Sequence, residues 1–387
     1  MRARTDELFP DENDTAEPER RYNTGILPSQ EIHALIESGA LRADPPILAE
    51  QVQPASLDLR LGAVAYRVRA SFLPGKGRTV QNKVDDLGTH AIDLTKDAVL
   101  ERGGVYIVPL LESVKLRRGL FGAANPKSST GRLDIFTRLI ADHATEFDRI
   151  PEGYAGPLYV EVSPRTFSIK VRQGSRLVQA RFRRGTPTPS AAATQRLHDR
   201  VGLLNAPDGE EIPLSAIDRE VPVSVDLQGH DGDGLVGYKA RAYTDLVDVD
   251  RVGAYRAADY WEPVYAPNNA LILDPNAFYI LVSREEVRVP PDYAAEMLPI
   301  NPLKGEFRVH YAGFFDPGFG YSEDDSAGSR AVLEVRSFEV PFLLEHGQTV
   351  GQLVYEPLTR PPDRVYGQGI GSNYQRQGLK LSKHFTV

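Results

Sequence analysis

The sequence repeats itself at a distance close to half its length. Tyr106-Ile107-Val108 recurs as Tyr279-Ile280-Leu281, which lies 173 positions later (279 − 106). Val160-Glu161-Val162 recurs as Leu333-Glu334-Val335 at the same offset. An offset this long is the size of a whole domain and too long for a solenoid repeat. The sequence therefore predicts two copies of one fold, and each copy can keep or lose functional residues independently.

Both halves consist mostly of short segments in which apolar and polar residues alternate. Ser56-Leu57-Asp58-Leu59-Arg60-Leu61 has this period of two, and 33 glycines and 29 prolines separate such segments. Alternation of this kind is typical of half-buried strands, and short strands between turns are typical of sandwiches and barrels. We expect few helices: one that is capped and begins at Ser29, and its counterpart from Leu197 to Leu204. The fold is predicted to be mainly β.

Composition along the chain indicates where the two copies begin and end. Residues 1–22 are acidic and carry no apolar stretch, so we expect a disordered extension and no secretory signal. The first domain is expected over 23–185. A Thr- and Pro-rich linker is expected over 186–193, and the second domain over 194–387.

Charge and cysteine content exclude several classes of protein. The chain has no cysteine, which excludes disulfides, thiolate metal sites and cysteine nucleophiles, and fits a cytoplasmic location. A net charge of −8 argues against general nucleic-acid binding. No apolar run is long enough to span a membrane, so no membrane association is expected.

The first candidate site is Lys127-Ser128-Ser129-Thr130-Gly131-Arg132 in the first copy. Its ammonium, hydroxyl and guanidinium groups can together donate many hydrogen bonds to one polyphosphate. The alternative is a polar surface turn. The second copy has Pro299-Ile300-Asn301-Pro302-Leu303-Lys304-Gly305 at the corresponding place, without the serines or the arginine.

The second candidate site is the segment from His310 to Gly320, in the second copy. Its Asp316-Pro317-Gly318 is turn chemistry, and the surrounding aromatic residues could enclose a flat ring while the carboxylate binds a sugar hydroxyl or a base edge. The alternative is a hairpin turn over aromatic core residues. The first copy has lost the Asp-Pro order, with Pro151-Glu152-Gly153 instead.

The third candidate is a carboxylate within an apolar strand, Glu161 in one copy and Glu334 in the other. Such a residue commonly lies on the solvated face of a strand. If it points into a pocket instead, desolvation raises its pKa and allows it to move protons. A structural hydrogen bond would also explain its presence in both copies. The glycine-rich tail, with Tyr374, Gln377 and Lys380, is either a lid over a nucleotide or a frayed terminus.

These segments together resemble the dCTP deaminase family of the dUTPase-like superfamily. Gln53–Gly62 is similar to the family's N-terminal signature, and Lys127–Arg132 to its phosphate motif, with Lys in place of the first Arg. Asp316–Phe319 resembles the base-and-sugar motif, Leu333–Val335 the strand with the catalytic Glu, and Tyr374–Gly378 the closing tail. The resemblance implies two tandem dUTPase-like distorted barrel or jelly-roll domains. The departure is that neither copy carries every motif.

The resemblance implies hydrolysis of dCTP to dUTP and ammonia at a site composed of both copies. Glu334 is expected to be the general acid and base, with Glu161 as the reserve candidate and Ser128 positioning the water. Nucleotide contacts are expected from the following residues: Lys127, Ser129, Arg132, His310, Asp316, Tyr374, Gln377 and Lys380. Magnesium is expected to be bound through the triphosphate, and zinc is not expected, because the Cys-rich zinc-deaminase motif is missing.

Other outcomes of the same resemblance stay open at this point. A dUTP diphosphatase, a bifunctional deaminase and diphosphatase, and a catalytically silent nucleotide-binding regulator are the alternatives. The partners implied are small nucleotides (dCTP, dUTP and dTTP) and further copies of the chain in a homo-oligomer, such as a trimer.

Overall fold

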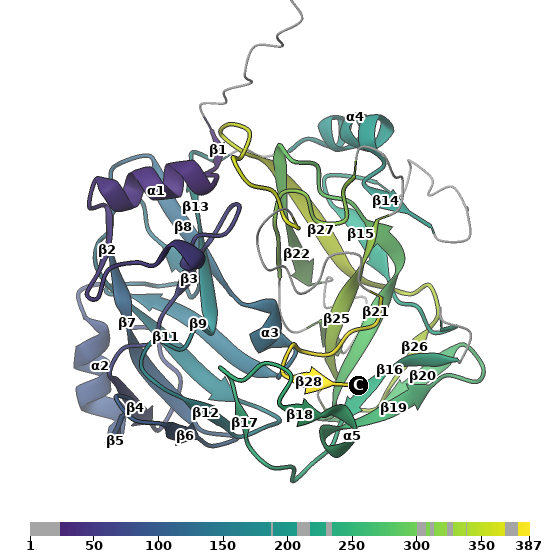
Figure 1. The fold of residues 1–387 in the computed structure, drawn as a ribbon, viewed down its shortest axis with the longest axis horizontal. Coiled ribbons are helices and arrows are strands. Elements are labelled where there is room, and N and C mark those ends of the chain that lie inside the picture. Colours follow the sequence, from purple (N-terminus) through teal and green to yellow (C-terminus); the bar gives the residue numbers. More distant parts are fainter. Residues whose placement is uncertain are drawn as a thin grey trace, which may run out of the picture.

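The computed structural model places two β-rich halves side by side, with helix α3 (Ser128–Gly131) at the seam between them (Figure 1). The structure describes residues 24–186, 189–206, 217–229, 234–299, 307–309, 313–322, 328–337, 339–367 and 378–387. The expected extension 1–22 and the proline-containing centre of the expected linker, 187–188, lie outside these residues.

The two larger sheets of the first half are antiparallel. The first sheet has the order β5 (Gly88–Asp93), β4 (Val64–Val68), β7 (Val105–Lys115), β11 (Ala155–Pro164) and β9 (Ile135–Ala141), with β2 (Leu41–Ala43) on β7. The second has the order β1 (Gly25–Ile26), β13 (Val178–Arg184), β8 (Leu120–Pro126) and β10 (Arg149–Ile150), with β3 (Leu57–Leu59) on β13.

The second half repeats the strand order of the first sheet, and its second sheet has four described strands where that of the first half has five. Its first sheet is β19 (Trp261–Tyr265), β16 (Leu235–Ala240), β21 (Phe278–Val287), β25 (Ser329–Ser337) and β23 (Phe307–Val309), with β14 (Leu204–Asn205) on β21. Its second is β15 (Val221–Ser224), β27 (Thr349–Pro357), β22 (Tyr293–Pro299) and β24 (Phe314–Phe315). The register is conserved as well, since Glu161 lies opposite Ile107 and Glu334 opposite Ile280. The prediction of a mainly β chain with two tandem copies of one fold is confirmed.

Short strands complete the two halves and connect them. In the first half, β6 (Ala98–Leu100) pairs with β12 (Ile169–Val171), and in the second, β20 (Ala270–Leu273) pairs with β26 (Phe342–Glu345). The second half also contributes β17 (Val247–Asp248), which pairs in parallel with β12 of the first half. Near the C-terminus, β28 (Phe385–Thr386) pairs with β18 (Tyr255–Arg256).

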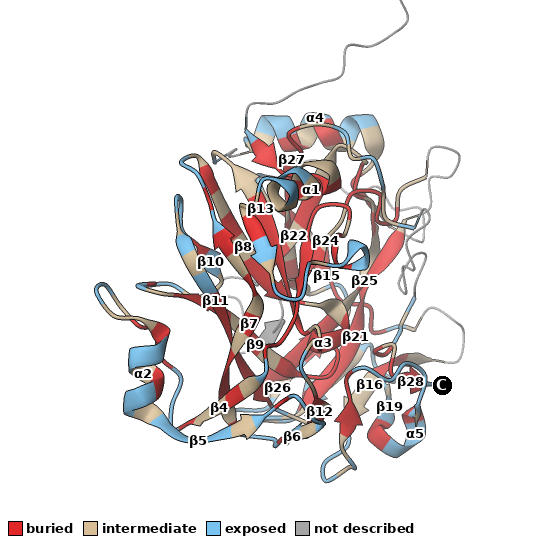
Figure 2. Ribbon diagram, turned by 60° about the vertical axis from the view of Figure 1, so that its left-hand side comes forward, coloured by how far each residue is buried: buried red, intermediate tan, exposed pale blue. Residues whose placement is uncertain are grey.

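The hydrophobic core runs through the contact between the halves. Trp261, Ile280 and Phe385 pack in the same cluster as the core of the first half. The ring of Phe167, from the first half, meets Trp261 edge-on at a centroid distance of 5.5 Å. Edge-to-face pairs of this kind contribute about 0.5–1.5 kcal/mol beyond the area they bury. Buried strands accordingly occupy the middle of the molecule, while the outward face of α2 (Val80–Leu87) is exposed (Figure 2).

The remaining helices are short: α1 (Ser29–Glu37), η1 (Ala49–Gln51), α4 (Ala191–Val201) and α5 (Ala257–Tyr260). Two sequence predictions about helices were wrong in detail. Ser29 does not cap α1, because Pro28 occupies the N-cap position and no side chain caps it. The counterpart helix lies further upstream than Leu197–Leu204. Ser190 caps its beginning, and Gly202, at φ 59°, ends it in the left-handed region that glycine adopts readily. None of the described helices is long and apolar enough to cross a bilayer.

Strand β3 also differs from the prediction of a half-buried strand, since Ser56–Leu61 is buried on both faces. The two charged side chains of this segment are buried as ion pairs. Arg60 Nε donates to Glu112 Oε1 over 2.7 Å, and Asp58 pairs with Lys127. Buried charges require such pairing, so the alternation in this strand separates an apolar face from a buried polar one.

Candidate active site

The hydroxyl-rich segment of the first half forms α3, a single helical turn that follows β8. The carbonyl of Lys127 accepts hydrogen bonds from the amides of Thr130 (2.8 Å) and Gly131 (2.9 Å), which close the turn. The amide of Lys127 donates to the carbonyl of Leu177 over 3.0 Å and ties the turn to the neighbouring strand. The turn therefore has a fixed position, with Ser129 buried and Ser128 partly exposed.

Three cations gather around the beginning of α3. Lys127 pairs with Asp58, and Arg176 Nη1 lies 4.0 Å from the same carboxylate. Burial lowers the pKa of Lys383, and the positive charges of Lys127 and Arg176 lower it further, while Asp58 and Asp250 raise it. The side chains of Lys127, Arg176 and Lys383 thus place positive charge at the beginning of α3, and such side chains suit a polyphosphate.

The C-terminal segment holds the other end of α3. Arg132 Nη1 donates to the carbonyl of Lys380 over 2.9 Å, and Ser382 Oγ donates to the carbonyl of Ser129 over 2.8 Å. The side chain of Lys380 is exposed, and its backbone carbonyl is the group that accepts the hydrogen bond from Arg132. Lys383, which is half-buried beside Lys127, is the better-placed lysine of the tail.

Glu334 of the second half lies within the electrostatic reach of this motif. Its exposure is 7%, and burial raises the pKa of its carboxyl to about 8; the positive charge of Arg132 lowers this pKa, and the negative charge of Asp134 raises it. Asp134 is in turn paired with Arg336, two residues beyond Glu334 on β25. A carboxyl group with this pKa is mostly protonated at pH 7 and can donate and recover a proton.

Asp316 follows β24 and is tied to the first half by Arg181. The guanidinium donates to the carbonyls of Ala295 (3.0 Å) and Phe315 (3.3 Å), and lies 3.3 Å from Asp316 Oδ1. It also stacks over the ring of Phe314 at 4.0 Å. Burial raises the pKa of Asp316 and Arg181 opposes this, while the charge of Asp58 raises it further.

The Asp-Pro-Gly segment is a turn, as its sequence predicts. The amide of Phe319 donates to the carbonyl of Asp316 over 3.1 Å. Glycine is favoured at position 318 for two reasons. Its φ of +90° is strained for other residues, and a Cβ there would lie 3.1 Å from the backbone nitrogen of Tyr366. Phe319 packs edge-on against Phe315 at 5.0 Å, so its ring belongs to the core of the second half.

Glu161, the counterpart of Glu334, has a different environment. It is 1% exposed, and burial raises its pKa while a hydrogen bond with Ser71 and the charge of Arg138 lower it. Its neighbour Ile107 packs with Val80 and other residues beneath α2. These groups all belong to the first half. The segment between β4 and β5, which contains α2, therefore covers the Glu161 carboxylate and separates it from the second half.

The structure thus brings together four predicted residues at the seam between the halves: Lys127, Ser129, Arg132 and Glu334. Asp316 lies near enough to this group for the charge of Asp58 to raise its pKa. His310, Tyr374 and Gln377 lie outside the described residues. Both glutamates are buried, so the interpretation that places them on a solvated strand face is wrong. Sequence reasoning missed Arg176 and Arg181 as candidates. The only signal for Arg176 was its place two residues after the Gly174 turn.

In the part of the chain that the structure describes, no three or more His, Cys, Asp or Glu side chains are grouped so that they could hold a metal ion. The donors around α3 are cations and hydroxyls, which suit phosphate oxygens and not a bare metal. The expectation that magnesium is bound through the triphosphate stays a prediction.

Models of two domains of one protein family match nearly the whole chain. The 2'-deoxycytidine 5'-triphosphate deaminase N-terminal domain matches residues 23–186, and the C-terminal domain of the same family matches residues 190–385. The chain belongs to the 2'-deoxycytidine 5'-triphosphate deaminase family.

A solved structure with both halves supports this membership. The crystal structure of 2'-deoxycytidine 5'-triphosphate deaminase from Agrobacterium tumefaciens is 55% identical, with a TM-score of 0.82, and the match covers 87% of this chain and 100% of that one.

Two curated relatives are named "dCTP deaminase, dUMP-forming". The protein from Methanobrevibacter smithii is 30% identical over 171 residues, which are 43% of this chain and 81% of the relative. The protein from Halobacterium salinarum is 36% identical over 119 residues, which are 30% of this chain and 57% of the relative.

Proposed function

We propose that this protein hydrolyses dCTP to dUTP and ammonia at one site built from both halves. The observation that carries this proposal is the position of Glu334: a buried carboxyl of the second half whose pKa responds to Arg132 of the first. Proton-transfer chemistry and phosphate recognition therefore meet at the seam. The family membership supplies the substrate class.

The triphosphate would bind at α3. Lys127, Arg176 and Lys383 supply positive charge, while the Ser128 and Ser129 hydroxyls and the Arg132 guanidinium supply hydrogen-bond donors. Magnesium would be carried by the phosphate oxygens, as is usual for nucleotide substrates. Asp316 would accept a hydrogen bond from the sugar, with Arg181 holding the turn that presents it.

Glu334 would carry each proton of the ring chemistry in turn. Its carboxyl protonates N3 of cytosine, and the resulting carboxylate takes a proton from the water as the oxygen bonds to C4. The regenerated carboxyl protonates the amino nitrogen, ammonia leaves, and the C4 hydroxyl returns a proton to Glu334 as the carbonyl of uracil forms. General acid–base catalysis of this type contributes about 10²–10⁴ in rate. Ser128 would position the water.

Simultaneous measurement of ammonia and nucleotide products tests this proposal. With dCTP and magnesium, we expect one ammonia for each dUTP formed. Tight dCTP binding with no ammonia released would refute the deaminase and favour a silent regulator.

The relatives named dUMP-forming favour a second candidate, a deaminase that also cleaves the triphosphate. That reaction attacks phosphorus as well as the ring and releases pyrophosphate. Phosphorus NMR of the same reaction distinguishes the two: pyrophosphate that rises in step with ammonia identifies the bifunctional enzyme, and an intact triphosphate identifies the simple deaminase.

A further inference from the structure

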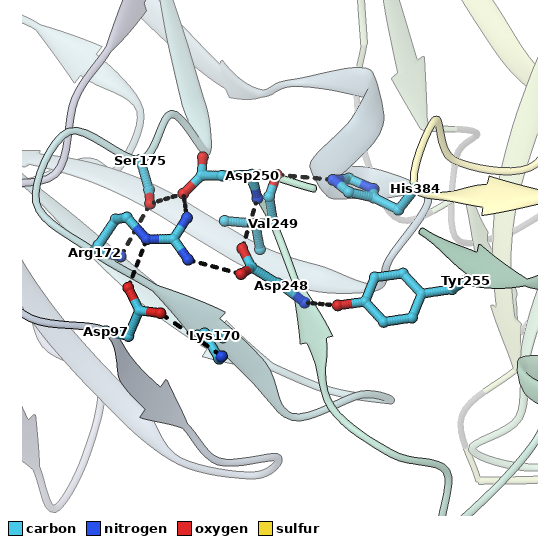
Figure 3. Close-up of polar contacts among 9 residues, drawn as sticks. All are labelled: Asp97, Lys170, Arg172, Ser175, Asp248, Val249, Asp250, Tyr255 and His384. Carbon is cyan, nitrogen blue, oxygen red and sulfur yellow. Dashed lines mark hydrogen bonds and ion pairs between the residues drawn. The ribbon is translucent and has the colours of Figure 1, made fainter. Parts of the chain in front are cut away.

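Arg172, at the end of β12, is the centre of an ionic cluster that joins the two halves (Figure 3). Its Nε lies 2.8 Å from Asp97 Oδ1, its Nη2 2.7 Å from Asp248 Oδ2, and its Nη1 2.6 Å from Asp250 Oδ2. Ser175 Oγ also donates to Asp250 Oδ2 over 2.6 Å. One guanidinium of the first half therefore holds two carboxylates of the second in fixed geometry. We call these four partners and Arg172 the β17 clamp.

The clamp exists because one connection of the second half crosses to the first. In the first half, residues 69–87 join β4 to β5 and fold back as α2 over Glu161. The corresponding residues 241–260 join β16 to β19 and instead add β17 to the first half, with Ile169 opposite Val247 and Lys170 opposite Asp248. The equivalent connection thus covers Glu161 in the first copy and joins the two halves in the second.

A chain of close polar contacts leads from the clamp to α3. Between the two clamped aspartates, the carbonyl of Val249 accepts a hydrogen bond from His384 Nε2 over 2.8 Å (Figure 3). His384 Nδ1 lies 2.9 Å from Ser382 Oγ, which donates to the carbonyl of Ser129 over 2.8 Å. Both His384 and Ser382 are buried, with 2% and 1% exposure, so each of these contacts is shielded from water.

The state of the His384 ring fixes the direction of these bonds. Burial lowers its pKa to about 4, although the hydrogen bond to Val249 and the two aspartates oppose this, so the ring is neutral at pH 7. Since Nε2 carries the proton given to Val249, Nδ1 can only accept, and the single proton of the Ser382 hydroxyl is given either to Nδ1 or to the Ser129 carbonyl. Ser382 is therefore the link whose loss directly frees the Ser129 carbonyl.

We infer that Arg172, His384 and Ser382 are positioning residues: they connect the domain-joining strand to α3 and fix the hydroxyl-bearing turn for the triphosphate. None of the three needs to touch the ring of the substrate. The inference rests on the proposed function for its substrate, but the position of α3 can be measured without turnover.

The test compares Ser382→Ala, His384→Ala and Arg172→Met with the wild type. The matched control is Arg241→Met, which removes an exposed ion pair, with Glu262 at 3.0 Å, from the same connection. We expect KM for dCTP to rise about tenfold in the three variants, which corresponds to about 1.4 kcal/mol, with kcat within about twofold. The dissociation constant of inorganic triphosphate should rise equally. Amide exchange in Ser129–Gly131 should become faster, and the control should show none of these changes.

Each outcome decides the inference. If Ser382→Ala leaves triphosphate affinity and exchange at α3 unchanged, the inference is wrong, and a loss confined to kcat would contradict it as well. If the wild type binds triphosphate but releases no ammonia, the proposed function fails, while the affinity and exchange measurements still test positioning. Two of the variants change the packing little, because Ser382→Ala removes one oxygen and the side chain of Arg172 is about one-third exposed. If the His384 variant fails to fold, these two variants still test the inference.

Discussion

Glu161 and Glu334 occupy the same place in the two copies, and their surroundings differ completely. Glu161 faces Ser71, Arg138 and the underside of α2, all from its own half. Glu334 faces Arg132 and Asp134 of the other half. The difference arises from one connection between strands, which folds back in the first copy and crosses over in the second. A duplicated fold can thus keep a carboxylate in both copies and give it access to the phosphate motif in one.

The largest expected effect is on turnover by the two matched glutamine variants. Glu334→Gln cannot exchange protons and should lower kcat by about 10²–10⁴. Glu161→Gln should leave kcat within about twofold, since its surroundings contain no part of the phosphate motif. Steady-state ammonia release measures both. Loss of activity in Glu161→Gln alone would reverse the assignment of the two halves.

A smaller effect is expected for the arginines that cross the seam. Arg181→Met leaves Asp316 buried without its cation and should lower the free energy of unfolding by about 3 kcal/mol. Arg183→Met is the control, because the side chain of Arg183 is 20% exposed, against 3% for Arg181, while its partner Glu356 lies at a comparable distance of 2.9 Å. Urea unfolding of both variants gives the comparison. Equal losses in the free energy of unfolding would show that the Arg181–Asp316 pair contributes no more to stability than the Arg183–Glu356 pair.

The smallest effect is a pH dependence of stability at Glu334. The folded pKa of about 8 lies above the ordinary value of 4.5, so the folded state binds more protons between these values and stability falls as pH rises. Wild type should therefore lose about 1.4 kcal/mol relative to Glu334→Gln between pH 6 and pH 7. Urea unfolding at the two pH values measures this. A constant difference would mean that Glu334 is ionised in the folded state.

The repeat in the sequence predicted much of this comparison. The offset of Val160-Glu161-Val162 from Leu333-Glu334-Val335 identified equivalent strands, and their registers agree in the structure. The phosphate segment and the Asp-Pro-Gly turn were found because their residue types have local chemical meaning. Each belongs to a different copy, which predicted a shared site.

Other features depend on contacts between distant residues and left no local pattern. Nothing near Arg181 in the sequence indicates that it binds Asp316, 135 positions away. The two residues of β17 have no pattern of their own, since their pairing is decided by β12. The burial of Glu161 likewise depends on a connection that folds back onto it. Periodicity reports which face of a strand is apolar and not what covers the other face.

The most direct test of the central claim is the number of nucleotides bound by each chain. Isothermal titration of Glu334→Gln with dCTP and magnesium, in which turnover is suppressed, measures this number. One shared site at the seam predicts one dCTP per chain, and Arg132→Met should abolish that binding event. Two dCTP per chain, with one retained in the Arg132 variant, would mean that each half binds nucleotide by itself.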